Sequence, residues 1–252
     1  VDGSAVTTVY TLRHYTSTVT WNSLIALDAD TYVLAFMDNQ NDGWLKTFTV
    51  SADGATLAQV ATLEHDLNNG QYNSLVKVDA NTVALAYTSS SNWGYIKTFT
   101  IPADGSSITE VSSFKHDGIQ GKFNSFVQAD SNTYVLAYSG SGNDGYIKTF
   151  TIPSSGATIT QVTRVEHDNQ RGEYNSLSKI SGGTDSYVLA YGGHDTDLGS
   201  AFDGFIKTFT IPADGSTITQ TYVLEHSITQ GEWNSLLQMD EDSFVLGYSG
   251  PG

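Results

Sequence analysis

The sequence consists of five similar units with a period near 50 residues. Each unit contains an aromatic residue followed by Asn-Ser, and the five asparagines are separated by 51, 51, 51 and 59 residues. A histidine keeps the same spacing, and a lysine within IKTFT or LKTFT occurs in four of the units. Self-similarity at this period is typical of solenoids and propellers, in which each repeat is one supersecondary unit.

The second unit indicates which architecture the repeat favours. Its segments NSLVKVD, VALAYTS, YIKTFTI and ITEVSSFKHD are β-rich and are separated by short stretches of Gly, Asn, Asp or Pro. The sequences ADG and NDG suit hairpin turns, because glycine adopts positive φ without steric cost. No helical periodicity is present, and the apolar content is nearly continuous. The unit therefore predicts a four-stranded antiparallel sheet of the kind that forms a propeller blade.

We predict an all-β fold, a five-bladed β-propeller of about 51-residue repeats that occupies residues 1–252 as a single domain. The four strands of each unit are called a to d in chain order. Residues 6–14 match strand d of the other units, so this N-terminal strand is expected to close the last blade and to remove an exposed edge. The expected blades are 22–65, 73–116, 124–167, 175–226, and 234–252 together with 1–14.

One strand is missing from this scheme. The units supply nineteen strands, whereas five four-stranded blades need twenty, and the fifth IKTFT strand is the one that is absent. Strands b and d of the last blade would then lie one strand width apart, with unpaired backbone groups. The sequence therefore predicts a longer parent chain, or an additional β-strand supplied by another segment or molecule to complete blade five.

Charge and composition narrow the classes of partner. The chain has 11 basic and 27 acidic residues, a net charge of −16 that would repel nucleic acid. It has no apolar run of about 18 residues, so no membrane span is expected. It has no cysteine, which excludes disulfides and thiolate chemistry.

The repeats resemble known propeller families. A histidine before strand a and a polar hairpin between strands b and c resemble the WD and kelch repeats. Five near-identical units are similar in architecture to the tachylectin type of five-bladed lectin, although its motifs are absent. Tandem IKTFTI units are similar to those of uncharacterised microbial secreted or surface proteins. The resemblance implies a propeller fold. For a binding module of this kind, an extracellular, cell-surface or virion-associated location is expected.

The repeated histidines and lysines are expected to be structural. In WD-type propellers a histidine and a hydroxyl form hydrogen bonds across strands, and the resemblance implies this role here. A lysine repeated within an apolar strand should be held by oxygen atoms between blades. The residues are His14, His65, His116, His167 and His226, with Lys46, Lys97, Lys148 and Lys207.

The aromatic-Asn pairs are the candidate ligand-binding residues. They begin strand a beside the d–a loops, which are expected to share a variable face with the b–c loops, including HDTDLGSAFDG of unit four. Packing between blades is one explanation of the aromatic side chains, and a stacking platform for sugar rings beside amide groups is the other. The residues are Trp21, Asn22, Tyr72, Asn73, Phe123, Asn124, Tyr174, Asn175, Trp233 and Asn234.

No cofactor is expected, with calcium as the one candidate metal. Asp38, Gln40, Asp42 and Gly43 imitate the start of an EF-hand loop, but Thr49 stands where the loop needs Glu. The pattern does not recur in the other units, so an ordinary NDG turn is the better interpretation.

Repetition favours a non-catalytic, lectin-like module with shallow sites for a glycan or surface ligand. A structural or protein-interaction propeller is the first alternative. A five-bladed glycoside hydrolase is the second, and it requires a pair of carboxylates in distinct roles. Glu173 and Glu232 lie in d–a loops but recur in two units, so the sequence alone favours a protein that is not an enzyme.

Overall fold

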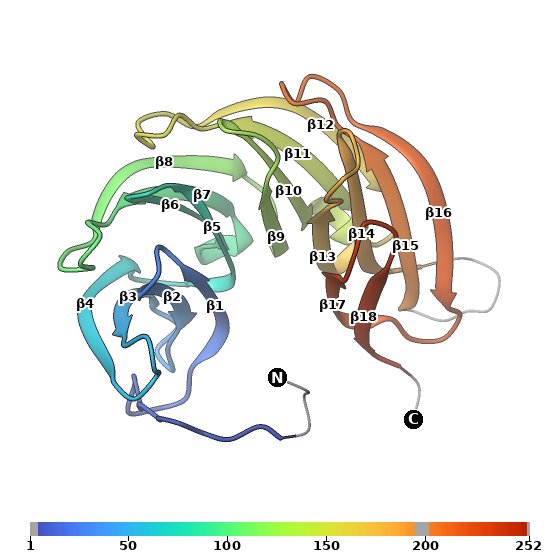
Figure 1. Ribbon diagram of the computed structural model, residues 1–252. Coiled ribbons are helices and arrows are strands. Elements are labelled where there is room, and N and C mark those ends of the chain that lie inside the picture. Colours follow the sequence, from blue (N-terminus) through green and yellow to red (C-terminus); the bar gives the residue numbers. More distant parts are fainter. Residues whose placement is uncertain (1–4, 195–201, 251–252) are drawn as a thin grey trace.

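The computed structural model describes residues 5–194 and 202–250 and shows an arc of antiparallel sheets around a central axis (Figure 1). The first sheet contains β1 (Thr20–Ala26), β2 (Thr31–Met37), β3 (Gly43–Val50) and β4 (Leu57–Asp66). The second contains β5 (Gln71–Asp79), β6 (Thr82–Thr88), β7 (Gly94–Thr100) and β8 (Thr109–Asp117). The third contains β9 (Lys122–Gln128), β10 (Thr133–Ser139), β11 (Gly145–Thr151) and β12 (Thr160–Asp168).

The fourth sheet contains β13 (Glu173–Lys179), β14 (Ser186–Gly193), β15 (Asp203–Thr210) and β16 (Thr219–Ser227). The fifth contains only β17 (Glu232–Gln238) and β18 (Phe244–Ser249). Strands in each sheet follow chain order from the axis outward. The all-β propeller architecture predicted from the repeat is confirmed, with four complete blades and a two-stranded fifth sheet.

The predicted closure by an N-terminal strand is not formed. Within the described residues, no strand precedes Thr20, and β18 pairs with β17 alone. The physical reason is the missing strand c, without which residues 6–14 have no neighbour in blade five to pair with. These residues instead lie against the first blade, where Val9 packs beside Gly54.

The core lies between blades rather than at a single centre. Strand b of a middle blade is buried along its whole length, as the burial of every residue of β6 and β10 shows. One cluster joins Ala84, Ala86 and Ile96 of blade two to Tyr134 and Leu136 of blade three. Each blade is thus covered on both faces, which explains the nearly continuous apolar segments in the sequence.

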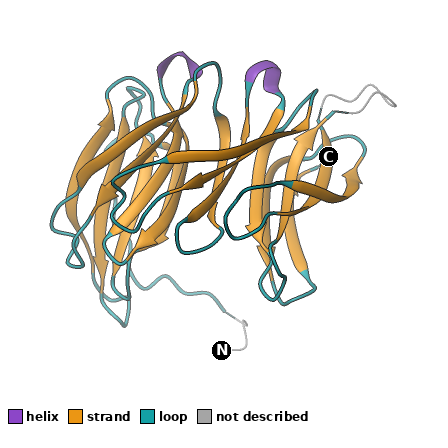
Figure 2. Cartoon of the chain, turned by 90° about the horizontal axis from the view of Figure 1, so that it is seen from above, coloured by secondary structure: helices purple, strands orange, loops and turns teal. Residues whose placement is uncertain are grey.

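The b–c loops and the d–a loops share one face of the propeller. The short 3-10 helices η1 (Ser90–Asn92) and η2 (Ser141–Asn143) lie in b–c loops on this face (Figure 2). The amides of Gly121 and Gly172 in the following d–a loops donate to the carbonyls of Asn92 and Asn143, each at 2.8 Å. Most of the long b–c loop predicted for unit four, at 195–201, lies outside the described residues.

Candidate functional site

Each inner strand carries a β-bulge at its repeated aromatic residue. The pairing register shifts between Thr20 and Ser23 in β1, and β5, β9, β13 and β17 show the same shift. At each bulge a bulky aromatic residue adopts positive φ, a left-handed conformation that is strained for any residue with a large side chain. The φ values are 57° for Trp21, 52° for Tyr72, 51° for Phe123, 54° for Tyr174 and 54° for Trp233.

The bulges bring the five aromatic rings together. Consecutive ring centroids lie 4.0, 4.5, 4.5 and 4.8 Å apart from Trp21 to Trp233. The last ring lies 5.9 Å from the first, nearly parallel to it, so the five side chains form a closed circle. We call these five side chains the aromatic circle. Trp233 is 57% exposed, whereas the other four aromatic side chains are half-buried.

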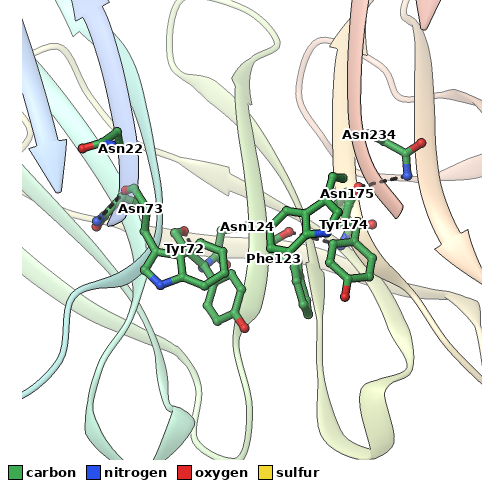
Figure 3. Close-up of a pocket in the computed structure, with 10 residues that line it drawn as sticks. Asn22, Tyr72, Asn73, Phe123, Asn124, Tyr174, Asn175 and Asn234 are labelled. Atoms are coloured by element: carbon green, nitrogen blue, oxygen red, sulfur yellow. Dashed lines mark hydrogen bonds between the residues drawn. The ribbon is translucent and has the colours of Figure 1, made fainter. Parts of the chain in front are cut away.

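The asparagines after the aromatic residues connect neighbouring blades. Asn124 Nδ2 donates to the carbonyl of Tyr72 in the preceding blade at 3.2 Å and to Gly121 in its own d–a loop at 3.1 Å. Asn73, Asn175 and Asn234 form the same two bonds. Figure 3 draws bonds from these asparagines to the preceding blade. The amide groups are therefore used to hold adjacent inner strands in register.

The serines complete this connection. Ser74 Oγ accepts a hydrogen bond from the amide of Phe126 in the next blade at 3.0 Å, and Ser23, Ser125 and Ser176 act in the same way. The aromatic-Asn-Ser motif thus aims a ring at the axis with its first residue and fastens blade to blade with the other two.

All ten predicted ligand-binding residues line one cavity of about 300 Å³ at the axis. The aromatic circle supplies the apolar wall of this cavity, and the asparagines lie around it (Figure 3). The structure therefore brings these residues together into one shared central cavity, and not into separate shallow sites on each blade.

Two carboxylate residues directly precede residues that line this cavity. Glu173 directly precedes Tyr174, and Glu232 directly precedes Trp233, so adjacent blades supply them at the same strand position. The other blades carry Thr20, Gln71 and Lys122 there. Sequence reasoning set the two glutamates aside because they recur. The available signal was that this position changes in chemical type, while an aromatic residue follows it in all five units.

The two glutamates have different environments. Glu173 is 9% exposed, and burial raises the pKa of its carboxyl group above the usual range. The nearby cations Arg171 and Lys122 lower this pKa in part, and the charge of Glu232 raises it further. Glu232 is half-buried and accepts a hydrogen bond from Gln230 Nε2 at 3.1 Å.

Tyrosine hydroxyls lie within the field of the same carboxylates. Burial raises the pKa of Tyr72 to about 12, and the charge of Glu173 adds to that shift. The pKa of Tyr174 is also raised, by burial first and then by Glu232 and Glu173. Both phenols therefore remain protonated donors at neutral pH and are available to bind oxygen atoms of a ligand.

The repeated histidines pack rather than form hydrogen bonds. His116 lies edge-on to Tyr138 of the next blade at 4.8 Å and directly over Gly94 of its own blade. Neither ring nitrogen of His65, His116, His167 or His226 has a hydrogen-bond partner among the described residues. The cross-strand bonds implied by the WD resemblance are therefore not formed, because glycine brings the backbone too close for anything but ring packing.

The repeated lysines cross from blade to blade. Lys97 Nζ donates to the carbonyl of His65 in the preceding blade at 2.7 Å, and Lys148 and Lys207 donate to His116 and His167. Lys46 donates to the carbonyl of His14 in the N-terminal segment. These lysines therefore lie away from the central cavity.

The calcium-like segment forms a turn. Asp38 Oδ1 accepts the amides of Gln40 and Asp42, and Oδ2 accepts Tyr15 and Trp44. Across the described residues, no group of three or more His, Cys, Asp or Glu side chains is placed to hold a metal ion. No helix in the described part of the chain is long and apolar enough to cross a membrane.

The fold was compared with known proteins. No family model and no curated protein matches the sequence. Solved propellers do match. An α-L-arabinofuranosidase of Fusarium graminearum has a TM-score of 0.54 and 14% identity over 82% of this chain and 66% of that one. A sialidase of Streptococcus pneumoniae has a TM-score of 0.52 and 13% identity over 69% of this chain and 27% of that one.

A periplasmic gluconolactonase of Pseudomonas aeruginosa has a TM-score of 0.52 and 12% identity over 80% of this chain and 71% of that one. The chain spans 55%, 45% and 27% of the length of three of the matching structures. At these identities the likeness shows the propeller fold. The absence of a matching family model leaves the WD, kelch and tachylectin resemblances without support at the family level.

The comparisons contradict the functional prediction made from the sequence. A non-catalytic, lectin-like module was expected, and the chain was expected not to be an enzyme. The three matching propellers described above are enzymes that act on sugars or a lactone by their names. The prediction treated repetition as an argument against catalysis, whereas these matching propellers are named as enzymes.

Proposed function

We propose that the chain is a glycoside-cleaving propeller. Its active site lies at the aromatic circle, with Glu173 and Glu232 as the two catalytic carboxylates. One observation carries the proposal. Adjacent blades place these two side chains at the same strand position, directly before Tyr174 and Trp233 of the cavity wall. Both carboxylates lie close enough to Tyr174 to raise its pKa, and Glu173 is buried. Glycosidases need two carboxyl groups that flank one bond and differ in protonation.

The environments of the two groups assign their roles. Glu173 is the general acid, because burial raises its pKa and so keeps its proton available for the leaving oxygen. Glu232 is the carboxylate that acts as nucleophile or as base toward water, since it is more exposed to solvent and accepts a hydrogen bond from Gln230. Trp233 supplies an exposed apolar face on which a sugar ring can stack.

The matching arabinofuranosidase and sialidase support the choice of substrate class. Both are named for the sugar bonds that they cleave, and both have a propeller fold. The substrate sugar is therefore sought first among furanosides and sialosides, and then among common pyranosides.

The test is hydrolysis of a panel of 4-nitrophenyl and 4-methylumbelliferyl glycosides by the purified chain. Glu173→Gln and Glu232→Gln should each lower kcat/KM by about 10²–10⁴-fold, the usual contribution of acid–base catalysis. Glu110→Gln is the matched control, because Glu110 lies on the outer strand β8 and pairs with Lys97 far from the cavity. Full activity in Glu173→Gln, or no turnover of any glycoside by the wild-type chain, would refute the proposal.

A further inference from the structure

The open edge of the fifth sheet is incompletely covered. In the other blades strand b pairs with both a and c, whereas β18 pairs only with β17. Tyr248 is 42% exposed and Val245 is 51% exposed. Their counterparts in blade three, Tyr138 and Val135, are fully buried. Apolar side chains and a free row of backbone groups are therefore left on this edge.

Around His14, the N-terminal segment occupies the place of the end of strand d on the far side of this edge. Lys46 donates to the carbonyl of His14 just as Lys97 donates to that of His65. The His14 ring lies edge-on to Phe36 with centroids 5.0 Å apart, as His65 lies on Tyr87 at 4.7 Å. Strand b and the position of strand d are thus both present, and the place between them belongs to strand c.

Three features of the surrounding residues define which side chains a strand c needs at this position. The first is an apolar cavity of about 290 Å³ between the N-terminal segment and blade one, lined by Leu12, Leu24, Leu34, Phe48 and others. In blade three the corresponding site is filled by Ile147, which packs against Tyr187, Leu189 and Phe209 of the next blade. A branched apolar side chain of a strand c would fill this cavity.

The second point is the carbonyl of His226, which corresponds to the carbonyls that accept a lysine in the other interfaces. His226 already lies on Tyr248 with centroids 4.7 Å apart, so blade five has the normal placement against blade four. The third point is the His14 ring. In blades one to four a glycine lies directly against the histidine, and a Cβ on Gly94 would approach His116 within 2.3 Å.

The required strand therefore reads glycine, aromatic, isoleucine or leucine, lysine, Thr-Phe-Thr. The register follows from blade three, where Leu136 pairs with Lys148 and Ala137 with Ile147. The counterparts on β18 are Leu246 and Gly247. We propose that blade five binds, by β-strand addition, an extended peptide segment of this repeat sequence.

A second copy of the folded chain is a poor donor. Each of its own strands of this sequence, β3, β7, β11 and β15, is the third strand of a four-stranded sheet and pairs on both sides. If a second copy donated one of these strands, two of its own strand pairings would be lost for the two formed in blade five, with no net gain in backbone hydrogen bonds. The occupant is therefore a free or terminal strand, and this inference does not depend on the proposed hydrolase site.

The experiment uses a synthetic peptide with the sequence of residues 144–152, DGYIKTFTI, and the intact chain. Isothermal titration calorimetry should show one binding site. In thermal denaturation, the midpoint of the chain should rise with peptide concentration. Peptides carrying Lys148→Glu or Gly145→Val, and a scrambled peptide, should bind at least tenfold more weakly. In the chain, Leu24→Lys charges the cavity wall and should also weaken binding at least tenfold.

Leu67→Lys is the matched control in the chain, because Leu67 is a similarly exposed leucine, 72% against 62% for Leu24, in a d–a loop. It should leave peptide affinity unchanged. Absence of binding, or equal binding of the scrambled peptide, would overturn the proposal. A stable dimer at micromolar concentration that the peptide fails to dissociate would also overturn it, since a second copy would then cover the edge.

Discussion

Asn175 Nδ2 donates a hydrogen bond of 3.2 Å to the backbone carbonyl of Phe123, two residues that belong to adjacent blades. The acceptor is the strained residue of the preceding β-bulge, with φ of 51°. Each asparagine therefore stabilises the unusual backbone that aims its neighbour's ring at the axis. The same hydrogen bond joins two blades and holds the β-bulge that positions the aromatic wall of the cavity. Its loss would therefore affect both the fold and the cavity.

This relationship predicts that Asn175→Ala lowers the free energy of unfolding by about 1–3 kcal/mol, the cost of unpaired buried acceptors. Asn22→Ala is the matched control. Asn22 is exposed, and within the described residues it forms no such bond to Trp233. Urea denaturation of both variants measures the difference. Equal losses in the two variants would show that the link contributes nothing.

The close approach of glycine to histidine gives a second prediction. A Cβ on Gly145 would lie 2.4 Å from His167 Cε1 and 3.1 Å from the Cα of Gly172. Gly145→Ala should therefore destabilise the chain by about 1–3 kcal/mol through overpacking. Gly118→Ala, where the nearest atom is Lys115 Cδ at 3.8 Å, should change stability little. Thermal denaturation that ranks the two variants in the opposite order would contradict this account.

Much of the fold could be predicted because the repeat fixes strand order and count. The same count located the missing strand c. Its consequence for the N-terminal segment could not be predicted, since pairing with β18 depends on a neighbour that the sequence lacks. The histidine contacts were also missed, because only the structure shows that Gly94 and Gly121 approach each other beside His116.

The site was predicted in part. The repeated motif identified the residues of the cavity, but positive φ at Tyr72 or Trp233 arises from bulges in strand pairing, which local sequence does not reveal. The two glutamates were noticed and dismissed. Their meaning depends on position, because only the bulge places residues 173 and 232 beside rings from other blades.

The buried histidines predict acid sensitivity. Burial lowers the pKa of His65, His116 and His167 to about 3, against a value near 6.5 in an unfolded chain. Between these values the unfolded state binds up to three more protons than the folded state. The free energy of unfolding should therefore fall as pH falls below 6.5, by up to about 4 kcal/mol per pH unit.

Urea denaturation from pH 7.5 to 4.5 measures this slope. His116→Asn should reduce it by about one third. An identical slope in the wild type and in His116→Asn would rule out the buried neutral histidine as a cause.

The exposed face of Trp233 predicts a separation of binding from stability. Its ring contacts Tyr174 and Trp21 at centroid distances of 4.8 and 5.9 Å, yet 57% of the residue is exposed. Trp233→Ala should therefore lower the thermal midpoint only slightly. If a sugar ring stacks on this face, the loss of about 1.5–3 kcal/mol of apolar contact should raise KM about 10- to 100-fold.

Because Trp233 does not donate or accept the transferred proton, kcat should change far less than in Glu232→Gln. Tyr222→Ala is the matched control, since Tyr222 is a 63% exposed aromatic residue on the outer strand β16. Michaelis–Menten measurements on the three variants separate the two effects. A large fall in thermal midpoint for Trp233→Ala, with KM unchanged, would instead mean that the aromatic circle only packs the axis of the propeller.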